Sequence, residues 1–126
     1  HRDLASHNWM IDHNNDAWLI DWDTVDYDLQ LGDVWQMSAR ILTENRWGDE
    51  WVNSVFLSYE LERPLTPLDK KILRTLFSFP NEFYREVIGL AYKKKGYKEE
   101  NVLRYLKKII SSRYQWRSQV KRLGNW

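Results

Sequence analysis

The sequence predicts a mainly helical fold that opens with a short β-hairpin. Two apolar and aromatic runs, WMID and AWLID, flank the turn-forming residues HNND within residues 9–22, and this arrangement is typical of a hairpin. From residue 28 onward, apolar residues recur with a helical period in about five segments. With 126 residues the chain has the length of one compact domain. The expected fold class is therefore mainly α, a short β-hairpin followed by about five helices.

The hairpin pattern predicts which side chains meet. With residues 14–15 as a two-residue turn, Ile11 faces Trp18 and Asn8 faces Asp21 across the strands. Because side chains alternate along a strand, one face would carry five large apolar residues. These are Trp9, Ile11, Trp18, Ile20 and Trp22.

The helical segments are expected at 31–44, 48–62, 66–79, 82–95 and about 98–122. The third has the clearest start signal, with Thr66 as cap, Pro67 at the first helical position and Asp69 three residues after the cap. Asn81 is expected to cap the fourth, which would end in three lysines before Gly96. No repeat or interdomain linker interrupts this series.

Composition narrows the function classes. The absence of Cys excludes disulfides, thiolate zinc sites and thiol catalysis. A formal charge of +1 provides no overall field toward nucleic acid or a membrane, and no apolar run reaches the length of a membrane span. The basic and aromatic stretch SSRYQWRSQVKRLGNW is interpreted as a solvated helix face. We therefore expect neither nucleic acid nor a membrane as a partner.

Three acceptor side chains come together by spacing. Asp3 lies in a loop five residues before Asn8, and the predicted pairing brings Asn8 beside Asp21. Hard oxygen ligands of this kind suit Mg²⁺, and a further carboxylate beside them can accept the proton of an attacking hydroxyl. The alternative is structural: short polar residues often cap turns and end strands.

The same residues match a known motif. His1 to Asn8 agree with every fixed position of H-R-D-L-x-x-x-N, the catalytic loop of protein kinases. The metal position reads DWD instead of D-F-G, and no A-P-E follows, which disfavours a protein kinase. The chain instead resembles the aminoglycoside phosphotransferases and choline kinases, and within that group the spore coat CotS family of endospore-forming bacteria. HRD, HNWMID, WLIDWD and YDLQLGDVWQMSARIL carry the resemblance, which is specific in residues 1–42 and general beyond them.

The resemblance implies roles for the three acceptors. Asp3 would be the catalytic base that deprotonates the acceptor hydroxyl. Asn8 and Asp21 would hold Mg²⁺ bridging the phosphates of ATP.

It also implies supporting residues. His1 would support the loop through a hydrogen bond, and Asp33 would be the aspartate that braces the loop backbone. Asp33 is equally explained as a first-turn acid favoured by the helix dipole. Asp23 could touch a second metal or a cationic acceptor, although a solvated acid at a strand end is the simpler interpretation.

The resemblance further implies an incomplete enzyme. Residues 1–23 would be the catalytic loop and metal-binding hairpin, and residues 28–126 a helical subdomain, together forming the C-terminal lobe of a kinase-like fold. The sequence has no glycine-rich phosphate loop and no VAIK-like strand, so the N-terminal lobe that binds ATP is expected to be absent and this piece alone inactive.

The expected function is transfer of the γ-phosphoryl group of ATP to a hydroxyl of a small molecule or sugar. The protein would be made in the cytoplasm and associated with the spore coat. The alternative is a non-catalytic, kinase-shaped coat or scaffold protein whose partners are other coat proteins.

Overall fold

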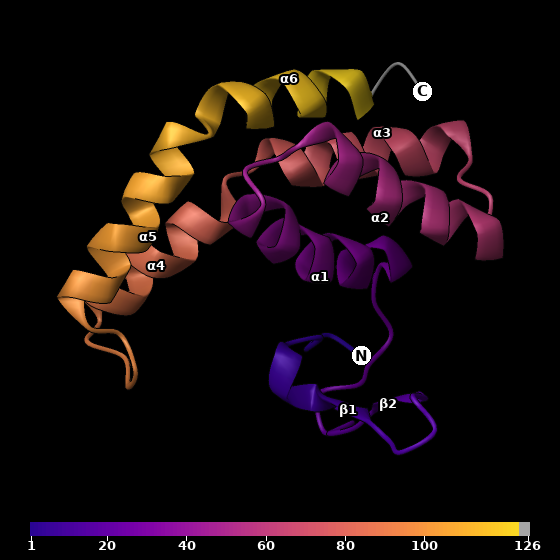
Figure 1. Ribbon diagram of the computed structural model, residues 1–126, viewed down its shortest axis with the longest axis horizontal. Coiled ribbons are helices and arrows are strands. Elements are labelled where there is room, and N and C mark those ends of the chain that lie inside the picture. The colour runs from indigo at the N-terminus through magenta and orange to yellow at the C-terminus, as the bar shows by residue number, and fades with distance from the viewer. Residues whose placement is uncertain (124–126) are drawn as a thin grey trace.

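A computed structural model, which describes residues 1–123, shows a mainly helical protein with a small N-terminal hairpin (Figure 1). The predicted fold class is confirmed. In chain order the elements are the 3-10 turn η1 (Ser6–Asn8), the strands β1 (Trp9–Ile11) and β2 (Ala17–Leu19), and the helices α1 (Gln30–Glu44), α2 (Asp49–Glu62), α3 (Pro67–Ser78), α4 (Asn81–Ala91), α5 (Glu99–Ser111) and α6 (Arg113–Leu123). The last three residues of the expected range 28–126 lie outside the described part. None of the described helices is both long and apolar enough to cross a membrane.

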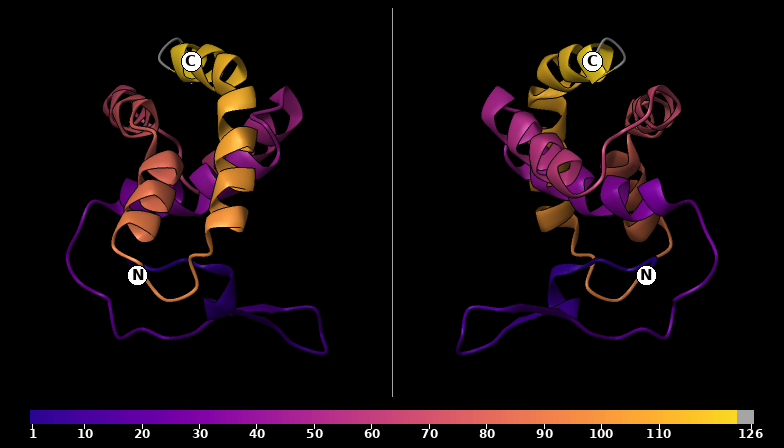
Figure 2. Two further views of the ribbon diagram at one scale, coloured as in Figure 1. Left: turned by 90° about the vertical axis from the view of Figure 1, so that its left-hand side faces the viewer. Right: turned by 90° about the vertical axis from the view of Figure 1, so that its right-hand side faces the viewer.

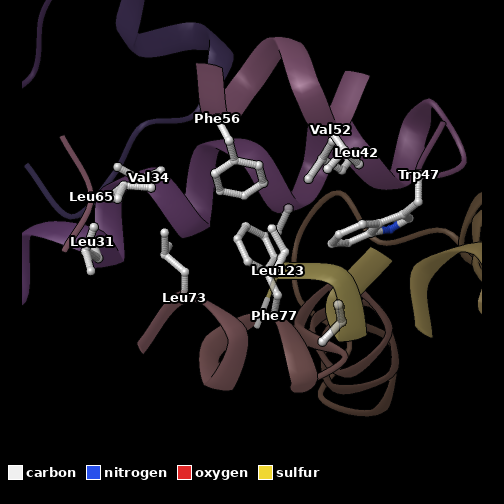
Figure 3. Close-up of a cluster of buried hydrophobic side chains, with 12 residues drawn as sticks. Leu31, Val34, Leu42, Trp47, Val52, Phe56, Leu65, Leu73, Phe77 and Leu123 are labelled. Carbon is white, nitrogen blue, oxygen red and sulfur yellow. The ribbon is translucent and has the colours of Figure 1, made fainter. Parts of the chain in front are cut away.

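The hydrophobic core lies between α1, α2, α3 and α6. Figure 3 shows their apolar side chains pointing toward one another, with Phe77 of α3 near the centre. The Phe77 ring meets the edges of Trp47 at 5.5 Å and Phe56 at 5.7 Å between ring centroids. Edge-to-face contacts of this kind add to the free energy gained from burying the rings. The helical body thus packs around one shared core, and the N-terminal segment lies beside it.

The start of α3 confirms the predicted cap. The Thr66 hydroxyl accepts a hydrogen bond from the backbone N–H of Asp69, and the Asp69 carboxylate accepts one from the backbone N–H of Thr66. Pro67 occupies the first helical position, where its missing N–H is not needed. The predicted ranges of α1, α2 and α3 agree with the structure within one residue at each end.

The structure corrects the predicted bounds of α4 at both ends. The helix begins at Asn81 itself, after Pro80, and no side chain caps it. It ends at Ala91 instead of Lys95 because Lys93 adopts a left-handed backbone with φ 50°. The N–H groups of Lys93 and Lys94 then bond back to the carbonyls of residues 90 and 89, which closes a Schellman motif.

The predicted helix 98–122 is two helices. α5 ends at Ser111, and α6 begins at Arg113 after a turn at Ser112. The hydroxyl of Ser112 donates to the carbonyls of Lys108 and Ile109, so it competes with the helical hydrogen bonds. The break turns α6 away from the direction of α5 so that it runs alongside α3, as Figure 1 shows. There the Trp116 indole donates to the Phe77 carbonyl at 2.9 Å.

The hairpin is confirmed, but its register is shifted by one residue. Met10 faces Trp18, and Trp9 faces Leu19. The loop has three residues instead of two because the Asp12 carboxylate accepts hydrogen bonds from the backbone N–H groups of Asn14 and Asp16. A one-residue slip moves every side chain to the other face, so the predicted apolar face of five residues does not form.

Candidate active site

The loop from His1 to Asn8 folds back on itself around Asp3. The buried Asn8 side chain donates a hydrogen bond from Nδ2 to the Asp3 carbonyl at 3.0 Å. The Asp3 carboxylate accepts from the backbone N–H of Ala5 at 3.3 Å. These bonds orient Asp3, whose side chain remains partly exposed.

Asn8 also joins this loop to the second strand. Its carbonyl accepts a hydrogen bond from the backbone N–H of Ile20 at 2.9 Å. The expected pairing of Asn8 with Asp21 is therefore wrong by one residue, since the three-residue hairpin loop places Ile20 opposite Asn8. Asp21 follows directly and is exposed, with a left-handed backbone of φ 61°. Such strained non-glycine residues concentrate at functional sites.

His1 ties the loop to the end of the hairpin. Its ring Nε2 lies 3.0 Å from the Ile20 carbonyl, and its Nδ1 accepts from the backbone N–H of Asp3 at 3.3 Å. One neutral tautomer satisfies both bonds, with the proton on Nε2. The ring also packs edge-on against Trp22, 4.8 Å between centroids. His1 thus holds the residues on either side of Asp21.

Asp33 of α1 lies under the same loop. Its carboxylate accepts hydrogen bonds from the backbone nitrogens of His1 at 2.8 Å and Arg2 at 2.9 Å. Arg2 has a left-handed backbone with φ 69°, and these bonds hold that conformation. The Asp33 side chain is 32% exposed, so the carboxylate that accepts these bonds is half-buried.

The Arg2 side chain reaches the segment that follows the hairpin. Its guanidinium forms exposed ion pairs with Asp26 at 3.5 Å and Asp28 at 3.3 Å. Nearby, the Thr24 hydroxyl donates to the His1 carbonyl at 2.8 Å. Residues 1–2 therefore contact this segment at several points.

Asp23 is exposed and makes no ion pair or hydrogen bond with any residue in the described range. This environment suits the simpler interpretation of a solvated acid. Across residues 1–123, no group of three or more His, Cys, Asp or Glu side chains is arranged to hold a metal ion. Asn8 is not among those residue types, and Mg²⁺ commonly takes only one or two protein ligands.

A cleft of about 630 Å³ adjoins Asp3. Its walls come from the loop, from the start of β1, from α1 and from α4. The charged and aromatic residues that line it are Asp3, Trp9, Arg40, Glu44, Glu82 and Arg85. A cleft of this volume is in the range that holds a small molecule. Figure 2 shows the hairpin extending beyond the lower edge of the helical body.

The charges in this cleft are paired. Arg40 lies 3.3 Å from Glu44 on α1, and Arg85 lies 2.7 Å from the buried Glu82 on α4. The Tyr105 hydroxyl of α5 donates to Glu82 at 3.1 Å. Burial raises the pKa of the Glu82 carboxyl, an effect that Arg85 and the Tyr105 hydroxyl oppose.

Sequence reasoning missed these cleft residues. Arg40–Glu44 and Glu82–Arg85 have the i,i+4 and i,i+3 spacings of ordinary surface ion pairs, so nothing in the pattern marks them as neighbours of Asp3. The sequence gives only a weak indication of the ion pairs of Arg2, namely that Asp26 and Asp28 follow closely after the hairpin.

Comparison with protein-family models finds no match, and no solved structure matches the chain significantly.

Proposed function

We propose that this chain is the catalytic-loop half of an Mg-ATP-dependent phosphotransferase that acts on a hydroxyl group of a small molecule or sugar. The part that binds most of the nucleotide would belong to a preceding N-terminal lobe. The proposal keeps the roles that the motif implies, with Asp3 as base and Asn8 and Asp21 as metal ligands.

The position of Asn8 supports the proposal most strongly. Its side chain bonds to the carbonyl of Asp3, and its backbone bonds to Ile20, the residue before Asp21. One buried residue therefore connects the proposed base with the proposed metal ligand. Phosphoryl transfer depends mainly on such positioning, because the protein has little covalent chemistry to perform.

The donor atoms fit a hard cation. The Nδ2 atom of Asn8 is used in the bond to Asp3, which leaves Oδ1 as the atom for a cation. Asp21 contributes an exposed carboxylate with no ion pair among residues 1–123. Amide and carboxylate oxygens are ligands that Mg²⁺ prefers. When bound, the ion would neutralise charge on the phosphates of ATP.

Asp3 would act on the acceptor. The acceptor oxygen attacks the γ-phosphorus of ATP, the bond from that phosphorus to the bridging oxygen of ADP breaks, and the hydroxyl proton passes to the Asp3 carboxylate. The cleft beside Asp3 provides space for the molecule that carries this hydroxyl.

The test is ATP turnover by a protein in which this chain follows an ATP-binding lobe, measured with Mg²⁺ and a panel of hydroxyl acceptors. We expect Asp3→Ala and Asp21→Ala each to abolish turnover, whereas Asp23→Ala serves as a matched control and leaves it nearly unchanged. The chain by itself should bind ATP negligibly. Unchanged turnover in both Asp3→Ala and Asp21→Ala would refute the proposal.

A scaffold role in the spore coat is the second candidate, and one observation favours it. The hairpin carries large apolar side chains that remain exposed, among them Trp9, Met10, Ile11 and Trp18. Exposed apolar surface of this kind is typical of protein contacts. A coat or scaffold protein would still assemble after Asp3→Ala and would fail to assemble after Ile11→Ser. The enzyme would instead lose turnover after Asp3→Ala and keep it after Ile11→Ser.

A further inference from the structure

We propose that the cleft beside Asp3 binds an uncharged polyhydroxyl molecule, such as a sugar or cyclic polyol, as the phosphoryl acceptor. This inference rests on the proposed function, because it names the substrate class of that site. It predicts a neutral acceptor. The alternatives are a cationic amine and an anionic, already phosphorylated compound, because phosphoryl transfer to a hydroxyl is possible with all three.

The charge balance of the cleft is the first argument. The two arginines of its walls are each paired with a glutamate, Arg40 with Glu44 and Arg85 with Glu82. Arg85 is also 3.0 Å from Glu86. The lining holds three acids, Asp3, Glu44 and Glu82, and two arginines, so its formal charge is −1. Asp3 is the lining acid that forms no ion pair with any residue in 1–123, so the uncompensated charge lies at the proposed base. A polycationic acceptor would need several free carboxylates, and an anionic acceptor would need a free arginine.

The hydrogen-bonding capacity of the cleft is the second argument. Each guanidinium–carboxylate pair places donors and acceptors side by side, and neighbouring hydroxyls on one ring can both donate and accept. Gln36 and Asn81 add amides to the lining, and Ser6 adds a hydroxyl.

Trp9 is the third argument. Its side chain lines the cleft and is 37% exposed, so one part of the indole is covered and another faces the space beside Asp3. The C–H face of a sugar ring is apolar and can pack on an aromatic ring while its hydroxyls point to the polar walls. The cleft thus combines an aromatic surface, polar walls whose two arginines are each paired with a glutamate, and the proposed base.

The test is an NMR titration of this chain with three matched probes: glucose, the cationic glucosamine, and the anionic glucose 6-phosphate. The indole N–H of Trp9 and the Nε–H of Arg40 report on the cleft, and the indole N–H of Trp18 reports on the hairpin outside it. We expect glucose to shift the two cleft signals, and the charged probes to bind about tenfold more weakly. Tighter binding of either charged probe, or no change in the cleft signals with any probe, would overturn the inference.

Charge variants provide a readout that a purely structural role would not change. Arg40→Gln leaves Glu44 unpaired and should shift the preference toward glucosamine, whereas Glu44→Gln should shift it toward glucose 6-phosphate. Arg104→Gln is the matched control, because Arg104 forms a similar i,i+4 pair with Glu100 on an exposed part of α5. If the preference does not change in the two cleft variants, the charge argument is wrong.

Aromatic variants test the packing surface. Trp9→Ala should abolish the shift at Arg40, Trp9→Phe should retain it, and Trp18→Ala should leave it unchanged. Failure of this inference is distinguishable from failure of the proposed function. If turnover requires Asp3 but only a cationic acceptor is used, the substrate class is wrong and the phosphotransferase stands. If glucose binds in the cleft and no turnover occurs, the phosphotransferase is wrong and a polyol site remains.

Discussion

The buried amide of Asn8 donates a hydrogen bond to the carbonyl oxygen of Asp3 at 3.0 Å. The two residues are five positions apart, and the 3-10 turn Ser6–Asn8 brings them together. Because the carbonyl of Asn8 also accepts from Ile20, the N-terminal loop and the hairpin form one hydrogen-bonded unit. The candidate site can therefore be tested through the stability of this unit as well as through activity.

Removing the Asn8 side chain should weaken the unit. In Asn8→Ala the Asp3 carbonyl loses its partner, and we expect the free energy of unfolding to fall by about 1–3 kcal/mol in urea titrations. Mn²⁺, a paramagnetic substitute for Mg²⁺, should broaden the NMR signals of residues 20–22 in the wild type. This broadening should disappear in Asn8→Ala. Asn14→Ala is the control, since Asn14 is exposed and bonds to Asp12 through its backbone. Equal stability and Mn²⁺ broadening in the two variants would contradict the role of Asn8.

Asp33 should control the order of residues 1–2 and of the segment they contact. Asp33→Ala removes the acceptor of the Arg2 backbone N–H and of the His1 amino group. Amide exchange in residues 2–5 and 20–24 should therefore rise by about tenfold or more, as expected for loss of a charge-assisted hydrogen bond. Exchange in the core helix α3 should stay unchanged. Asp28→Asn is the control, because it loses only an exposed ion pair with Arg2. If Asp33 acts only on the helix dipole, exchange will rise in α1 instead.

Asp12 should determine the hairpin register. Its carboxylate accepts from Asn14 and Asp16 and, at 3.0 Å, from the Trp18 indole. In Asp12→Ala the three-residue loop loses these bonds, and cross-strand NOEs between Met10 and Trp18 should weaken or be replaced by those of another register. Asp16→Ala is a matched control in the same loop, because Asp16 contributes only its backbone. Retention of the Met10–Trp18 NOEs in Asp12→Ala would show that the strands set the register by themselves.

The cap of α3 should give the protein a measurable acid sensitivity. Hydrogen bonds from the backbone and hydroxyl of Thr66 hold the pKa of the Asp69 carboxyl below its usual 3.8. A lowered carboxyl pKa contributes stability that is complete above the unfolded value and is lost as the pH falls through the folded value. The advantage of the wild type over Asp69→Asn in urea unfolding should therefore be constant at neutral pH and shrink below about pH 3.8.

Thr66 itself allows a separate check of this cap. Thr66→Ala should lower the free energy of unfolding by about 1 kcal/mol, the usual cost of losing a threonine cap. Thr75→Ala on the same helix is the control, since the exposed Thr75 hydroxyl donates only to the carbonyl of Lys71. A cost for Thr75→Ala equal to that for Thr66→Ala would mean that helix propensity, and not capping, explains the effect.

Two helical glycines should respond in opposite directions to alanine. A methyl group at Gly89 of α4 would overlap the ring of Tyr97, whereas one at Gly32 of α1 would meet no atom within 4 Å. We expect Gly89→Ala to destabilise the protein by about 1–3 kcal/mol and Gly32→Ala to stabilise it by about 0.5–1 kcal/mol. Thermal unfolding of both variants tests this. Gly89→Ala combined with Tyr97→Ala should recover part of the loss, and no recovery would place the strain elsewhere.

Local patterns determined much of this protein. The start of α3 is encoded by Thr66, Pro67 and Asp69, because each satisfies or removes a need of the first helical turn. The hairpin and the ranges of α1 and α2 follow from the period of their apolar residues. The motif from His1 to Asn8 singled out Asp3 and Asn8, and the hairpin that follows it singled out Asp21.

The tertiary structure decided what depends on contacts between distant residues. The hairpin register is one example, since the backbone N–H of Ile20 bonds to the carbonyl of Asn8 across the strands and Asp21 does not lie opposite Asn8. The split between α5 and α6 at Ser112 cannot be read from helix period, because both halves keep that period and the break is stabilised by packing on α3.

The same holds for the bonds between Asp33 and the nitrogens of residues 1–2, and for the cleft in which the ion pairs of α1 and α4 meet the loop that carries Asp3. Spacing along the chain predicts neighbours only within one element, where the backbone geometry is known. Asp33 meets His1 across 32 positions, and Glu82 meets Tyr105 across 23. Such contacts exist only after the helices have packed, because packing alone brings their distant side chains within hydrogen-bonding distance.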